Sequence, residues 1–184
     1  MILEQLLISR YNSSITGRFK RITSENLDKF WRAVRISEAR VAVALDCTVY
    51  VIIKPPADTW TRWPIISCKV TMIWVYFFRW RIDTEVWHGH NFKTMSISTM
   101  TFSPGEQFQT VLHDGRDCLV TMEVDVENGV MRTIQRPVDT TLPATTIERI
   151  FSEEGLVMTM ACGDVFAESE FTRCLEEEEQ SYLY

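Results

Sequence analysis

Short runs of extended-type sequence alternate with turn-forming residues from Phe92 to the end of the chain, and this pattern constrains the fold most. The turn signals are "SPGEQ", "HDGRD", "ENG", "SEEG" and "CGD". Within the run "VFAESEF", Ala167 and Phe171 fall on one face, and Glu168 and Glu170 fall on the other. Because side chains of a strand point alternately to opposite faces, the small and apolar face is expected to look inward. Strands repeated at intervals of about 8–12 residues predict an antiparallel sandwich or barrel.

The front of the chain has a helical pattern instead. In "SENLDKFWRAV" the apolar residues recur at helical spacing, with Thr23 or Ser24 as the expected N-cap and Glu25 and Asp28 in the first turn. A second short helix is predicted in "ISEARVAVA". The coarse order is therefore one strand at about 14–20, two short helices, and strands to the end.

Length and composition favour a single domain in a reducing compartment. The 184 residues are 46% hydrophobic and 24% charged, which suits one globular domain with its own core. Five widely spread cysteines, an odd number without C-x-x-C spacing, suggest neither a disulfide framework nor a zinc site. The opening "MILEQLLISR" lacks a basic region typical of a signal peptide. The most apolar run, Val70 to Phe78, is about half the length that a membrane-spanning helix needs, so we expect a cytoplasmic protein.

Charge is distributed unevenly along the chain. The formal net charge is −6, with "EEEE" at 176–179 and a basic stretch from Arg18 to Arg40. The net acidity disfavours nucleic-acid binding, and the acidic tail is expected to be solvated.

Motifs for catalysis or metal binding are weak. His88 and His90 lie two residues apart without a third ligand nearby, which is a poor pattern for a metal site. His113 and Cys118 stand near a predicted turn and do not form a convincing nucleophile pair. Neither a phosphate-binding glycine loop nor a G-x-S-x-G motif is present.

The middle of the chain is irregular in pattern. Residues 64–91 hold several tryptophans, mixed charge and no sustained period. We interpret this segment as an insertion and assign it no secondary structure.

Three stretches resemble the intracellular lipid-binding proteins, which include the fatty-acid-binding and cellular retinoid-binding proteins. They are "ITGRFKRITSENLDKFWRAV", "FSPGEQFQTVLHDGRDC" and "TTIERIFSEEGLVMTMACGDVFAESEFTR". The resemblance covers about two thirds of the chain and implies a mainly β, ten-stranded up-and-down antiparallel barrel of the lipocalin-like (calycin) type with a helix-turn-helix lid. It implies a lipid-binding domain at 14–173 that includes the insertion at 64–91, with an N-terminal extension at 1–13 and an acidic tail at 174–184.

The resemblance also implies a ligand head-group site inside the barrel. Arg149 matches a family arginine that binds the ligand carboxylate, whereas Ser169 and Phe171 replace the arginine and tyrosine of the family's R-x-Y motif. Gln135 and Arg116 match further polar positions. Periodicity alone leaves open an outward-facing Arg149 with a one-residue register shift.

The missing R-x-Y pair affects the expected ligand. Loss of those donors predicts weaker carboxylate binding, by about 1–3 kcal/mol, and leaves a weaker acid, an alcohol, an aldehyde or a neutral lipid as alternatives to a fatty acid.

The same resemblance predicts the apolar walls and partners of the site. The expected cavity-lining residues, with plain core packing as the alternative, are Phe30, Val34, Ala39, Ile147, Met158, Met160 and Ala167. Lys29, Arg32, Arg35 and Arg40 on or near the lid are expected either to contact anionic membranes or simply to be solvated.

The resemblance therefore implies a monomeric cytoplasmic carrier, neither an enzyme nor dependent on a cofactor, that reversibly binds a long-chain fatty acid or similar hydrophobic ligand for intracellular lipid transport. The alternative is a vestigial or protein-interaction barrel whose cavity is filled or disrupted.

Overall fold

Ten antiparallel strands form one curved sheet, closed at one end by two helices. The computed structural model describes residues 15–54, 80–88, 94–112 and 114–174. The elements are β1 (Gly17–Glu25), α2 (Leu27–Ala33), α3 (Glu38–Asp46), β2 (Thr48–Lys54), β3 (Trp80–His88), β4 (Thr94–Phe102), β5 (Gln107–Val111), β6 (Asp117–Asp125), β7 (Val130–Pro137), β8 (Thr145–Phe151), β9 (Gly155–Cys162) and β10 (Val165–Arg173).

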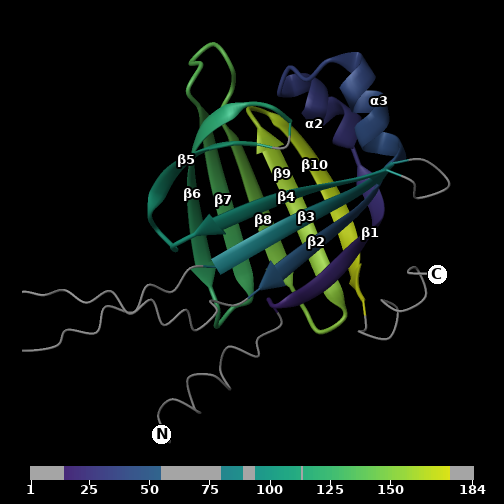
Figure 1. Ribbon diagram of the computed structural model, residues 1–184, viewed down its shortest axis with the longest axis vertical. Helices are drawn as coiled ribbons and strands as arrows, with labels where there is room; N and C mark the ends of the chain where they lie inside the picture. Colours follow the sequence, from purple (N-terminus) through teal and green to yellow (C-terminus); the bar gives the residue numbers. More distant parts are fainter. Residues whose placement is uncertain (1–14, 55–79, 89–93, 113, 175–184) are drawn as a thin grey trace, which may run out of the picture.

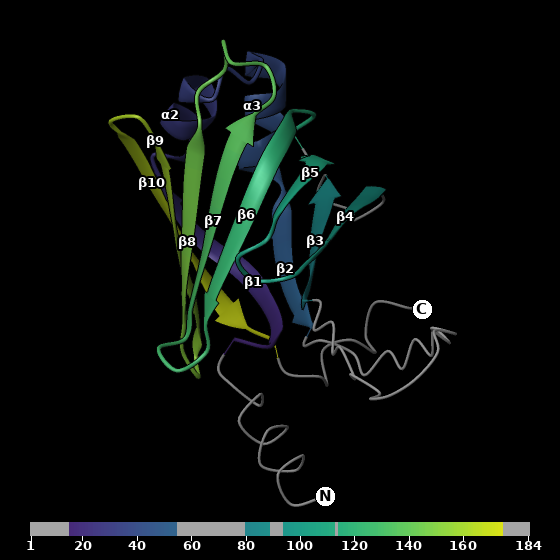
Figure 2. The same ribbon diagram turned by 90° about the vertical axis from the view of Figure 1, so that its left-hand side faces the viewer.

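Neighbouring strands are mostly neighbours in sequence, and the exception is the pairing of the first strand with the last. The strand order is β4-β3-β2-β1-β10-β9-β8-β7-β6-β5, so β1 pairs with both β2 and β10. In Figure 1, β2, β3 and β4 cross in front of β6 to β10, and α2 and α3 cover the upper end of the barrel. Figure 2 shows the same lid from the side, above the ends of β6 to β9.

The alternation predicted from the sequence is present in the closing strands. In β10, Ala167, Ser169 and Phe171 are buried, and Glu168 and Glu170 are exposed. Strands β6 and β7 alternate in the same way. One face of the sheet therefore turns inward, as expected for a barrel.

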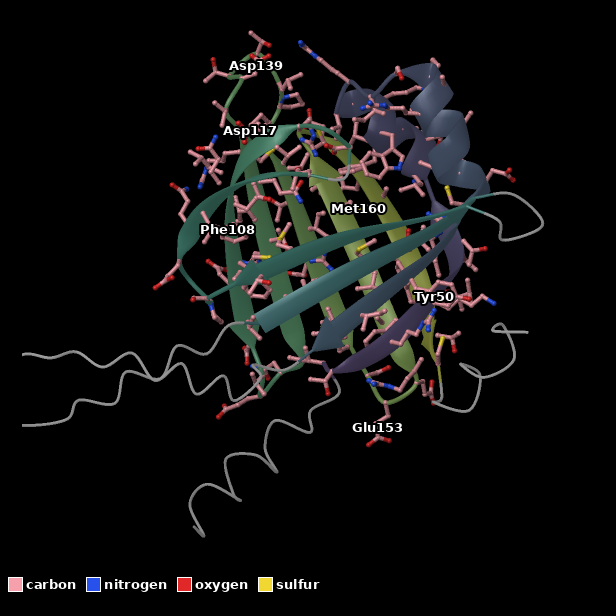
Figure 3. The ribbon with its side chains drawn as sticks, in the orientation of Figure 1. Tyr50, Phe108, Asp117, Asp139, Glu153 and Met160 are labelled. Atoms are coloured by element: carbon pink, nitrogen blue, oxygen red, sulfur yellow. The ribbon has the colours of Figure 1, made fainter. Side chains whose placement is uncertain are left out.

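Two apolar clusters fill the interior at different levels. The lower one includes Phe19, Phe151 and Phe171, and the upper one joins Phe30 of the lid to Met160 of β9. Figure 3 labels Met160 within the space that the strands enclose. The lid is thus attached by burial of its apolar face on β9 and β10.

The first helix begins later than the sequence predicts. Its N-cap is Asn26 in a left-handed conformation, rather than Thr23 or Ser24. The reason is that β1 extends to Glu25, because Ser24 pairs with Ser169 and Glu25 with Glu168 of β10. Strand pairing with β10 therefore prevails over the local capping preference of serine and threonine.

Part of the expected insertion at 64–91 lies in the sheet. Residues 80–88 form β3, which pairs with β2 and β4 along its length. No period is visible there in the sequence, because β3 combines tryptophan, charged and apolar residues. Residues 64–79 and 89–91, the extension at 1–13 and the tail from 175 lie outside the described residues, so the proposed domain limits stay predictions.

Candidate ligand-binding site

Strand register places the predicted polar residues on the inner wall at defined levels. Arg149 of β8 lies opposite Met131 of β7 and Met158 of β9, and Met158 lies opposite Ser169 of β10. Gln135 lies opposite Thr145, nearer the lid. Arg149 and Ser169 thus share one level of the barrel, two strands apart, which corresponds to about 10 Å between their backbones.

Arg149 points into the barrel. Its side chain is only 9% exposed, whereas the neighbouring Glu148 faces outward and pairs with Arg132 at 2.6 Å. This excludes the outward-facing alternative that periodicity left open. The arginine of the "TTIERIF" strand is therefore an interior residue, bordered by Ile147 and Phe151 on the same face.

The Arg149 guanidinium is only partly satisfied. Its Nη1 donates a hydrogen bond to the Thr133 hydroxyl at 2.8 Å, and its buried Nε has no partner. Within the described part of the chain, no carboxylate pairs with it. Burial lowers the pKa of Arg149 to about 10, so the side chain remains positively charged at neutral pH. An unpaired buried charge of this kind is costly and favours an anionic partner.

Gln135 and Arg116 form a second polar group nearer the lid. Gln135 Oε1 accepts hydrogen bonds from Thr145 Oγ1 at 2.8 Å and from Arg116 Nη2 at 3.3 Å. Arg116 also forms an ion pair with Asp114, with 2.8 Å between Nη2 and Oδ2. The positive charge of Arg116 is therefore balanced inside the protein, unlike that of Arg149.

The positions that replace the R-x-Y motif offer fewer donors. Ser169 is 1% exposed, and its hydroxyl donates to the Ser24 hydroxyl at 3.2 Å. Phe171 is 3% exposed and belongs to the lower apolar cluster. Of these two, only Ser169 has a group that can hydrogen-bond a ligand.

Most predicted lining residues lie in the upper cluster beneath the lid. Phe30, Val34, Met160 and Ala167 are buried there. Ile147 and Met158 pack against this cluster but keep accessible surface, although they face inward. Whether these residues line a ligand cavity or only pack the core stays a prediction.

Ala39 does not fit its predicted role. It lies at the start of α3 and is exposed, whereas Val41 is buried at 1% exposure. The helix begins at Glu38, and the two residues from Ala39 to Val41 correspond to about 200° of helical rotation, so the two side chains lie on opposite faces. The short apolar pattern "ARVAVA" did not distinguish the two faces.

A pocket of about 570 Å³ adjoins the lid. It lies between the turn joining α2 and α3, the turn before β6 and the turn before β8. Its lining residues are Val34, Arg35, Ile36, Ser37, Arg40, Asp114, Gly115, Arg116, Asp117, Asp139 and Leu142. The volume is within the range typical of small-molecule sites. Arg40 donates to the Asp114 carbonyl at 2.8 Å and so links the lid to the turn before β6.

Basic residues of the lid differ in how far their charge is balanced. Arg32 contacts Asp28 at 2.7 Å and Glu38 at 2.9 Å. Among the residues that the structure describes, Lys29 donates to the neutral amide of Asn26, at 2.8 Å, and to no carboxylate. The charge of Lys29 is thus more available to an external anion than that of Arg32.

Sequence reasoning missed three polar residues of this interior. Thr133, Thr145 and Asp114 all contact the predicted arginines or Gln135. The threonines are on the inward face of the alternation, and both could have been found from it. Asp114 lies in a turn, where no periodicity indicates direction.

Other features carry no site in the described residues. No group of three potential metal ligands occurs among them. His88 ends β3, but its side chain and His90 lie outside what the structure describes. No described helix is long and apolar enough to cross a membrane.

The ten-stranded antiparallel barrel with a two-helix lid is the fold of the fatty-acid-binding proteins. This confirms the mainly β class and the lid expected from the sequence.

Individual known proteins resemble this chain in sequence and fold, although no family model matches it. A curated Caenorhabditis elegans protein, fatty acid-binding protein homolog 6, is 22% identical over 162 residues, which cover 88% of this chain and 98% of that protein. The crystal structure of apo lipid binding protein 8 from Caenorhabditis elegans is 16% identical with a TM-score of 0.66, covering 88% of this chain and 96% of that one.

A Schistosoma mansoni fatty acid binding protein in complex with arachidonic acid is 21% identical with a TM-score of 0.65, covering 89% of this chain and 98% of that one. The resemblance to the intracellular lipid-binding proteins, first indicated by the sequence motifs, is confirmed by these likenesses.

Proposed function

We propose that this protein is a non-catalytic carrier that reversibly binds one long-chain fatty acid, or a closely similar hydrophobic anion, inside the barrel. The carboxylate meets Arg149, and the acyl chain extends toward the lid past Met158 and Met160. Such a carrier would work in the cytoplasm as a monomer and move lipid between membranes.

The observation that carries the proposal is the unbalanced charge of Arg149. In the described part of the chain, the buried guanidinium donates to one neutral hydroxyl and leaves Nε without a partner. A ligand carboxylate would supply the missing anion and accept a charge-assisted hydrogen bond, worth about 1.5–3 kcal/mol. This favours a fatty acid over the alcohol, aldehyde or neutral lipid that the missing R-x-Y donors left open. Ser169, on the same level, would add a second contact by donating its hydroxyl proton to the carboxylate instead of to Ser24.

Adaptable side chains along the proposed acyl path support the same function. Methionine fills irregular space and suits ligands with flexible chains. Met158 contacts both apolar clusters and keeps accessible surface, although it faces the barrel interior.

Displacement of a fluorescent fatty-acid probe tests the proposal. We expect saturable uptake of the probe with one site per chain and competitive displacement by an unlabelled fatty acid. The Arg132→Gln variant, which removes an arginine from the outer face, serves as a control and is expected to bind normally. Folded protein without saturable uptake would contradict the carrier function and favour the vestigial or protein-interaction alternative.

A further inference from the structure

Two arginines lie in the interior, and they differ in whether a carboxylate balances their positive charge. Arg149 has no described carboxylate partner, whereas Arg116 is neutralised by Asp114, with both side chains nearly buried. An anionic head group is therefore attracted to Arg149. Arg116 has little net charge to offer a second anion.

Arg116 nevertheless has an unused donor. Its Nε donates to Asp114 at 2.9 Å, and its Nη2 is shared between Asp114 and Gln135. Its Nη1 is buried and has no partner among the described residues. A buried donor without an acceptor is unfavourable, so this atom favours a ligand oxygen that is neutral rather than charged.

Nearby protein acceptors are already engaged. Gln135 Oε1 accepts two hydrogen bonds, and Asp114 uses both carboxylate oxygens on Arg116. A ligand that brought only methylene groups past this point would leave Nη1 unsatisfied. Arg116 also lines the pocket beside the lid.

The separation between the two arginines fits one ligand. Arg116 reaches the level of Gln135, and Arg149 reaches the level of Thr133 on the same strand. Two residues along a strand span about 7 Å. A long acyl chain with its carboxylate at Arg149 therefore passes the level of Arg116 partway along its length.

Extending the proposed function, on which this step rests, we propose that the preferred ligand is an oxygenated fatty acid. Its carboxylate is bound by Arg149, and a hydroxyl, keto or epoxide oxygen along the chain accepts a hydrogen bond from Arg116 Nη1. The class is distinguished from plain fatty acids by this second, neutral acceptor nearer the lid.

Calorimetric titration of octadecanoic acid and a positional series of hydroxyoctadecanoic acids tests the proposal. In the unaltered protein we expect at least one hydroxy isomer to bind about tenfold tighter than the plain acid, as expected for one added hydrogen bond to a charged group. The preference should depend on hydroxyl position, because Arg116 is fixed by Asp114 and Gln135.

The Arg116→Met variant keeps an unbranched side chain but removes every hydrogen-bond donor at this position. We expect the ratio of hydroxy-acid to plain-acid affinity to fall close to one, whereas Arg132→Met on the outer face should keep it. The proposal is overturned if no isomer binds more tightly than the plain acid, a result that needs no variant to fold. It is also overturned if the ratio survives Arg116→Met. Failure of every acid to bind would refute the carrier function itself.

Discussion

Arg149 and Thr133 are joined by a 2.8 Å hydrogen bond between Nη1 and the hydroxyl, across the paired strands β8 and β7. This contact orients a buried cation without neutralising it. The Arg149 side chain is therefore expected to lower the stability of the ligand-free protein and to bind an anionic ligand.

Replacement of Arg149 by leucine should change stability and binding in opposite directions. Removing an unpaired buried charge is expected to raise the free energy of unfolding of the empty protein by about 1–3 kcal/mol. Fatty-acid affinity should fall about 10- to 100-fold, because the charge-assisted hydrogen bond is lost. Chemical denaturation and calorimetric titration measure the two effects.

Arg132→Leu is the matched control, since Arg132 is exposed on the outer face and pairs with Glu148. In Arg132→Leu, the changes in the free energy of unfolding and in fatty-acid affinity should both be small. Equal losses of affinity in the two variants would contradict the interior role of Arg149.

Fatty-acid affinity should be nearly constant from about pH 6 to 9, because in this range Arg149 stays charged and a carboxylate stays ionised. Burial lowers the pKa of Arg149 to about 10 in the empty protein, and a bound carboxylate would raise it again. Affinity is therefore expected to fall as pH rises above about 10, where the empty protein alone begins to lose the proton.

The same shift has a consequence for folding. Because the folded pKa is lower than the unfolded one, Arg149 destabilises the fold while it is protonated, and this penalty is relieved as pH rises through about 10.

Titration of fatty-acid affinity against pH, in the unaltered protein and in Arg149→Leu, checks whether Arg149 causes the fall in affinity above about pH 10. A profile that is the same in both proteins would contradict it.

Gly155→Ala should strongly destabilise the barrel. A Cβ at this position would overlap the Phe171 carbonyl oxygen of β10, which is backbone and unable to move aside. We expect a loss of about 2–4 kcal/mol in the free energy of unfolding, as for overpacking with a backbone shift. Thermal or chemical denaturation measures it.

Gly163 provides the comparison for that variant. It has a positive φ of 58°, but a methyl group added there would meet open space, so alanine should cost only about 1 kcal/mol. A larger loss at Gly163 than at Gly155 would contradict the close approach of β9 and β10.

Transfer of a fluorescent fatty acid to anionic vesicles should depend more on Lys29 than on Arg32. Within the described ranges, Lys29 donates to a neutral amide and to no carboxylate, whereas Arg32 contacts two carboxylates. Each available basic residue near an anionic surface contributes about 1 kcal/mol. We expect Lys29→Gln to slow transfer several-fold at low salt, with a weaker effect for Arg32→Gln.

High salt should remove the difference between these variants, because it screens surface charges. Transfer rates that are equal in both variants and insensitive to salt would show that the lid charges are merely solvated.

The closing strands could be predicted from the sequence because their inner and outer faces differ in chemistry. Glu168 and Glu170 alternate with Ala167 and Phe171, and the structure keeps that order. The resemblance then placed Arg149 inside, which periodicity alone did not decide.

Other features depend on contacts between distant residues. Strand β3 has no clear alternation, and its place follows from pairing with β2 and β4. Ala39 was assigned to the wrong face of α3 because a short helix rich in alanine and valine has little polar contrast. Asp114 was missed as a partner because its role requires the turn that brings it to Arg116.

The most direct test of the central claim is the affinity of the unaltered protein for a fatty acid compared with the alcohol of the same chain length. Because the buried guanidinium of Arg149 has no described carboxylate partner, we expect the acid to bind at least about tenfold tighter than the alcohol. Equal affinity, or tighter binding of the alcohol, would contradict the role of Arg149 as a carboxylate anchor.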